Sequence, residues 1–215
     1  MALFIIFIII VLLIVVWSVG IFLYEKHLER PSYEVIEKHN GYEVRMYDPY
    51  IIAETEVTGG YESASNKGFG ILAGYIFGNN TRKEKVAMTA PVAMEKKQTG
   101  EKISMTVPVI MQPKGAEQNE KYIMSFMMPS KYTLDNLPKP NDPAVKLHRV
   151  SEKKVAALRF SMLAKADRVE KKTKQLREAL KRDGFTAFSE PEIARYNAPF
   201  SNPLLRRNEI LIKIE

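Results

Sequence analysis

The feature that most constrains the fold is an Ala-Pro step that closes two similar segments, about a hundred residues apart. In the first segment, KVAMTAPV at residues 85–92, apolar side chains fall on alternate positions, which is the period of a strand with one buried face. Pro91 cannot donate a hydrogen bond to a sheet, so we expect this strand to bend or to meet an edge there. The step recurs at Ala198 and Pro199, which predicts an internal duplication.

The segments before each step follow the same order. In the first half, apolar spacing predicts strands at 32–37, 42–47 and 50–57, a helix at 61–76, and the strand 85–92. In the second half, it predicts strands at 145–150 and 155–163, a helix that Asp167 caps and that runs to about residue 182, and a strand at 193–200. A hairpin of strands 102–111 and 121–128 lies between the halves, and a last strand covers 209–214.

The distance from the second strand to the Ala-Pro step is also similar, with 34 residues from Val57 to Pro91 and 36 from Leu163 to Pro199. Two such strand-strand-helix-strand units predict a pseudo-twofold α+β fold, in which a curved, barrel-like sheet carries both helices.

An apolar stretch at residues 2–24 has no charged side chain. As a helix it would reach roughly 33 Å, enough to cross a hydrocarbon core. We therefore predict a transmembrane anchor at 1–24, a juxtamembrane linker at 25–31 and one domain at 32–215. A cleaved signal peptide is the alternative, but it would need a basic start. Lys26, Arg30 and Lys38 follow the stretch, which favours a single-pass membrane protein with a cytoplasmic domain.

Composition excludes several kinds of site. The chain has no cysteine, so disulfides, thiolate metal sites and cysteine nucleophiles are excluded. The net charge of +7 lies on the domain and favours an anionic membrane surface as a neighbour. The basic runs are scattered and lack interleaved aromatic residues, so we expect no nucleic-acid partner. The sequence contains no phosphate loop, nucleophile elbow or HExxH motif, and we expect no enzymatic activity.

Four stretches in order resemble the SOUL family of haem-binding proteins, over roughly residues 33–215. They are YEVRMYDPY at 42–50, GFGILAGYIFGNN at 68–80, KVAMTAPV at 85–92, and YNAPF with RRNEILI at 196–212. The resemblance implies a distorted antiparallel barrel with two helices related by the internal repeat. It also implies that the ligand is haem or a related tetrapyrrole, held for buffering or transport, as a cofactor on which folding does not depend.

The resemblance further implies site residues. Some members carry a histidine, proposed as an axial ligand of the haem iron, where this chain has Met46, a weaker ligand. Other members hold haem against the first helix by apolar and basic side chains, at positions matched here by Asn66, Phe69, Ala73 and Gly74. Asn66 and Gly74 replace an arginine and a lysine, which leaves Lys67 as the nearby cation. His27, His39 and His148 are expected at the surface.

Two alternative interpretations remain, one of the methionine residues and one of the function. The strand faces are rich in methionine, which suits a planar ring but also fills ordinary cores. The alternative function is a protein-interaction or effector-sensing module that binds another hydrophobic small molecule.

Overall fold

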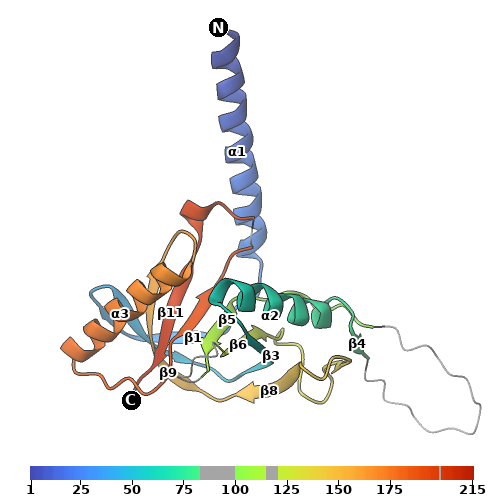
Figure 1. Cartoon of the computed structure of the whole chain (residues 1–215), viewed down its shortest axis with the longest axis vertical. Coiled ribbons are helices and arrows are strands. Elements are labelled where there is room, and N and C mark those ends of the chain that lie inside the picture. The colour runs from blue at the N-terminus through green and yellow to red at the C-terminus, as the bar shows by residue number, and fades with distance from the viewer. Residues whose placement is uncertain (83–99, 115–120, 199) are drawn as a thin grey trace, which may run out of the picture.

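The computed structural model of the chain describes residues 1–82, 100–114, 121–198 and 200–215 (Figure 1). The predicted strand at 85–92 and Pro199 lie outside the described residues. The match between the two Ala-Pro steps therefore stays a prediction.

One curled antiparallel sheet dominates the fold. Its neighbouring strands, from one edge to the other, are β1 (Tyr33–His39), β2 (Tyr42–Tyr47), β9 (Lys153–Phe160), β11 (Asn208–Lys213), β10 (Glu192–Arg195), β5 (Val109–Pro113), β6 (Lys121–Met127), β3 (Tyr50–Thr58) and β8 (Lys146–Val150). A separate short pair joins β4 (Asn80–Thr81) to β7 (Lys139–Pro140). The sheet forms a half-barrel, with β1 and β8 as its edges.

The two halves of the chain interlock within this sheet. Strand β2, from the first half, pairs with β9 of the second half, and β8, from the second half, pairs with β3 of the first. Helix α2 (Tyr61–Ile76) contacts β3 and β6, whereas helix α3 (Ala166–Arg182) contacts β9 and β11. Apart from the additional edge strand β1, the arrangement is symmetric about the boundary between β10 and β5. The predicted pseudo-twofold α+β fold is thereby confirmed.

Both helices cover the same face of the sheet, and the main core lies between them and the strands. Helix α3 buries Val169, Leu176 and Leu180, as its apolar spacing predicts. A smaller cluster on the opposite face contains Tyr47 and Val107. Strand β2 is therefore buried on both of its faces.

Four predicted boundaries were wrong, among them the strand expected at 155–163, which spans Lys153–Phe160. The strand expected at 102–111 begins only at Val109, directly after Pro108, which has no N–H to offer a sheet. Helix α3 follows Lys165, and Asp167 lies in its first turn without capping it. Strand β10 ends at Arg195, since the chain beyond it turns toward the N-terminal helix, where Ala198 donates its N–H to Glu25.

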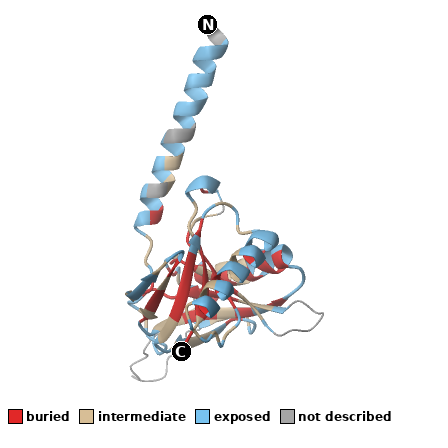
Figure 2. Cartoon of the chain, turned by 90° about the vertical axis from the view of Figure 1, so that its left-hand side faces the viewer, coloured by how far each residue is buried: buried red, intermediate tan, exposed pale blue. Residues whose placement is uncertain are grey.

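The N-terminal helix α1 (Ala2–Lys26) rises away from the domain, and its first turns contact no other part of the chain that the structure describes (Figures 1 and 2). Its mean hydropathy is 3.3 over an exposed stretch, and among the described residues it is the one helix long and apolar enough to cross a membrane. The short segment η1 (Pro203–Leu205) lies beside its lower turns.

Candidate functional site

Five of the six predicted site residues lie on helix α2, mostly on its outer side. Asn66 and Lys67 are exposed, and Ala73 and Gly74 are half-buried, because the opposite side of the helix packs on the sheet. Phe69 lies at the edge of this surface, with its ring 5.4 Å from the ring of Phe126 on β6. This outer surface of α2 offers one cation, Lys67, and one large apolar side chain.

Met46 lies apart from these residues. It sits on β2, half-buried, and pairs with Glu34 of β1 and Lys154 of β9. Helix α2 lies instead over β3 and β6, which are separated from β2 by at least four strands of the sheet order. The six predicted residues are therefore not brought together as one group, and their roles stay a prediction.

A groove of about 590 Å³ runs along helix α3, and its lining is mainly apolar. Tyr61 comes from the start of α2, Tyr122 from β6 and Ile193 from β10, and Val169 and Thr173 come from α3 itself. The sheet and both helices therefore meet at this place. We call it the α3 groove.

Basic side chains of α3 border the groove. Lys174, Arg177 and Lys181 line it together with two acids, Glu170 and Glu178. Over its whole length α3 carries seven basic and three acidic side chains. The excess of positive charge on α3 produces an electrostatic potential that favours a bound anion.

Two polar groups of the groove show how it is built. Arg195 donates a hydrogen bond of 2.7 Å to the Tyr61 hydroxyl. Burial raises the pKa of Tyr61, which keeps the phenol protonated at neutral pH. The Thr173 hydroxyl oxygen is buried and has no hydrogen-bond partner among the described residues. A buried hydroxyl without a partner is costly in free energy.

A second groove, of about 550 Å³, lies on the sheet face opposite the helices, and its lining is about equally polar and apolar. Its lining includes His148 and a buried ion pair in which the Lys153 ammonium lies 2.7 Å from Glu192. Burial alone would lower the pKa of Lys153, but the Glu192 carboxylate raises it above its ordinary value. These charges are already paired, and the surface suits a flat apolar ring less well than the α3 groove does.

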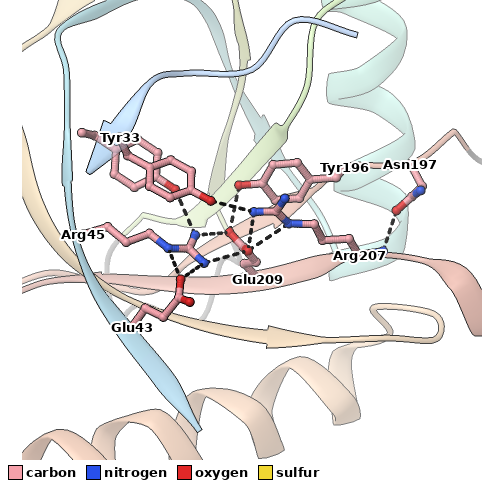
Figure 3. A network of polar contacts seen from close by, with 8 residues as sticks. Tyr33, Glu43, Arg45, Tyr196, Asn197, Arg207 and Glu209 are labelled. Carbon is pink, nitrogen blue, oxygen red and sulfur yellow. Dashed lines mark hydrogen bonds and ion pairs between the residues drawn. The ribbon is translucent and has the colours of Figure 1, made fainter. Parts of the chain in front are cut away.

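A further polar network surrounds the fully buried carboxylate of Glu209 (Figure 3). Glu209 on β11 receives hydrogen bonds from Arg45 at 2.9 Å, from Arg207 at 2.8 Å and from the Tyr196 hydroxyl at 2.8 Å. The Arg45 and Arg207 guanidinium groups also stack over the rings of Tyr33 and Tyr196, respectively. This network joins YEVRMYDPY to YNAPF and RRNEILI, so these stretches hold the fold together.

Sequence reasoning missed both the network and the α3 groove. Arg45 and Glu209 are 164 residues apart, and no local period connects them. The groove is lined from five separate stretches of the chain. The one usable signal was the excess of lysine and arginine on an amphipathic helix at 166–182. Among the described residues, no three His, Asp or Glu side chains are arranged to hold a metal ion.

The sequence model of the family described as SOUL heme-binding protein matches residues 28–100 and 94–213. No curated protein matches the chain. Solved structures with a similar fold include the C-terminal domain of EcmrR, with a TM-score of 0.58 and 8% identity, covering 85% of this chain and 98% of that one. A hydrolase from Listeria innocua has a TM-score of 0.52 and 10% identity, covering 84% and 94%. At such identities the likeness concerns the fold alone.

Proposed function

Because this chain belongs to the SOUL haem-binding protein family, we propose that its domain binds haem or a related tetrapyrrole without catalysing a reaction. Helix α1 would hold the domain at a bilayer, where such apolar ligands partition. The role would be to buffer or carry the ligand. The observation that carries this proposal is the α3 groove, with its apolar walls and basic border.

The α3 groove suits a tetrapyrrole in its volume, in the side chains of its walls and in its charge. Its volume of about 590 Å³ lies within the usual range of ligand pockets, about 300 to 1,000 Å³. The aromatic and aliphatic walls, including Tyr122 and Ile193, suit a planar ring. Lys174 and Lys181, which line the groove, would pair with the two propionates.

Binding at this place would rest on apolar contact and charge. The described residues that line the groove include no histidine, methionine or cysteine, and the Tyr61 phenol is kept protonated by its raised pKa. Haem would bring its own redox chemistry, and the chain would supply orientation and partial exclusion of water. We therefore expect iron-free protoporphyrin to bind about as tightly as haem.

The outer surface of α2 is the competing site. Its Asn66, Lys67, Phe69, Ala73 and Gly74 are the residues that the family resemblance implies. It has one cation for two propionates and exposed polar side chains, which support the proposal less well. Met46 would serve as an axial ligand only if the ligand reached β2.

The test is a titration of the full-length chain in lipid nanodiscs with haem and with iron-free protoporphyrin, referenced to empty nanodiscs. The variant Lys174→Glu/Lys181→Glu reverses the groove border. We expect its affinity to fall about tenfold at low salt, which corresponds to about 1.4 kcal/mol for the two contacts. The matched control Arg168→Glu/Lys171→Glu makes the same charge change on α3 at residues outside the groove lining.

The outcomes separate the two sites. An unchanged affinity in Phe69→Asp together with a loss in the border variant would support the α3 groove. Loss of binding in Phe69→Asp alone would assign the ligand to α2. A change of the haem absorbance spectrum in Met46→Ala would show that sulfur reaches the iron. Non-saturable uptake, equal to that of empty nanodiscs, would overturn the proposed function.

A second candidate is an interaction or effector-sensing module that takes another hydrophobic small molecule. The described groove residues include no histidine, methionine or cysteine, which favours this candidate, because selectivity for a tetrapyrrole would then depend mainly on shape and charge. Competition by an unrelated apolar carboxylate, such as a bile acid, at the concentration that displaces half of the protoporphyrin would support this candidate.

A further inference from the structure

An exposed apolar loop lies next to the base of helix α1. The side chains of Phe200, Leu204 and Leu205 are each more than half exposed, and the loop projects from the domain beside α1 (Figure 1). Segment η1, which holds both leucines, begins at Pro203, eight residues after strand β10 ends at Arg195. Three large apolar side chains are thus exposed to solvent in one short loop, and exposed apolar patches often mark a contact with a membrane or a partner.

The loop is fastened to α1 by a buried carboxylate. Glu25, in the last turn of α1, is 4% exposed, although the sequence predicts it within a polar linker. It accepts hydrogen bonds from the Asn197 side chain at 2.5 Å, from the Ala198 N–H at 2.7 Å and from the Ser201 hydroxyl. Three donors on one carboxylate hold the loop and the helix in a fixed relation.

A further contact lies higher on the helix. The Asn202 side chain donates a hydrogen bond of 3.3 Å to the Ser18 hydroxyl. Ser18 precedes Tyr24 by six residues, which is about 9 Å along a helix axis. The loop therefore reaches to the level of the apolar part of α1, beyond the residues at its base (Figure 1).

Two arginines flank the leucines. A hollow of about 550 Å³ is lined by Arg159, Ser161 and Arg206 beside Leu204 and Leu205. Guanidinium groups next to exposed leucines are the arrangement expected where headgroups meet acyl chains, because each kind of side chain then finds its own layer.

We propose that the loop at residues 200–206 inserts into the bilayer interface beside α1, so that the domain contacts the membrane at two points. The inference rests on the proposed membrane-spanning role of α1. Its occupant is lipid, since the loop is fixed along the one described helix able to span a bilayer. With two contacts, the domain keeps one orientation on the membrane.

The absence of cysteine allows a direct test with single-cysteine variants carrying an environment-sensitive fluorophore. Phe200→Cys and Leu204→Cys probe the loop, and Val11→Cys probes α1. Phe188→Cys is the matched control, because Phe188 and Phe200 are both 59% exposed and Phe188 lies near the C-terminus, at the far end of the domain. The full-length protein is reconstituted into phosphatidylcholine vesicles with phosphatidylglycerol and a lipid-borne quencher, placed near the headgroups for positions 188, 200 and 204 and in the acyl chains for position 11, which lies near the middle of the apolar stretch.

We expect quenching at positions 200 and 204 to be at least about threefold stronger than at 188, as for side chains held in the interfacial layer. If quenching at positions 200 and 204 is as weak as at position 188 while position 11 is quenched, the loop does not insert, but α1 still spans the membrane. If position 11 also stays unquenched, the anchor itself fails. Strong quenching at 188 would mean that another face meets the membrane and would overturn the inference.

Discussion

Glu209 is a charged residue with no solvent exposure, and its neighbours explain why this is tolerated. Two guanidinium groups and one phenol donate to its two oxygens, so all of its strong acceptor positions are used. Arg45 is held in turn by Glu43 at 2.7 Å. The cost of burying these charges is offset only while the whole network is complete.

We predict that Glu209→Gln lowers the free energy of unfolding by about 3 kcal/mol, because it leaves buried Arg45 without its full counter-charge. Urea denaturation measures this. The control is Glu56→Gln, which removes the partner of Lys114 in an exposed pair and should leave the midpoint unchanged. Equal midpoints for both variants would show that the network does not stabilise the fold.

The same residue predicts a pH dependence. Burial alone would raise the pKa of Glu209, but hydrogen bonds and charge from Arg45 and charge from Arg207 lower it below the ordinary value of 4.5. A lowered pKa in the folded state gives a stabilisation that is complete above the unfolded pKa and is lost as pH falls through the folded one. The difference in unfolding free energy between wild type and Glu209→Gln should therefore shrink below about pH 4.5. A difference that stays constant down to pH 3 would contradict this assignment.

At the scale of single elements, helix α2 is shaped by one close contact. A Cβ built on Gly68 would lie 3.0 Å from the Met124 Cβ on β6, so the helix rests on the sheet through a residue without a side chain. Gly70 and Gly74 have no atom within 4 Å of a built Cβ. The small residues of α2 therefore permit close packing at Gly68 and only weaken the helix at the other two positions.

We predict that Gly70→Ala raises the free energy of unfolding by about 0.5 to 1 kcal/mol, since alanine has the higher helix propensity and meets open space. Gly68→Ala makes the same chemical change but forces α2 away from Met124, so its stability should be below wild type. Thermal unfolding of both variants decides the matter. Similar gains for both would show that α2 does not pack as closely as described.

At the scale of the whole molecule, the duplicated halves do not form separate units. Strand β2 pairs with β9, and β3 pairs with β8. Each half therefore provides a hydrogen-bonding partner for a strand of the other half. Any cut between the halves leaves unpaired sheet edges and exposed core side chains.

We predict that fragments 28–144 and 145–215 are each unfolded alone and assemble when mixed, because the missing strand pairs are then restored. Circular dichroism melting should show a cooperative transition for the mixture and none for either fragment. Cooperative melting of one fragment on its own would mean that the halves are independent. The intact chain 28–215 serves as the reference for the mixture.

Much of the fold could be predicted because it depends on local periods. The alternation in 121–128 places Met124, Phe126 and Met128 in the main core, and the three- and four-residue steps in 61–76 coincide with α2. The predicted starts of β5, at Val109, and of α3, near Asp167, were wrong because the neighbouring residues, rather than the apolar periodicity, determine where each element begins. The candidate site was less predictable, because residues from five separate stretches of the chain line the α3 groove.

By itself the sequence determined the element order, the apolar faces, the membership of the family and the presence of a long apolar helix, since each is recorded within a few dozen consecutive residues. Only the tertiary structure decided that Arg45 meets Glu209, that the halves exchange strands, and that Glu25 fastens a distant loop. Such contacts depend on the closure of long loops and on burial, and neither leaves a periodic trace in the order of residues.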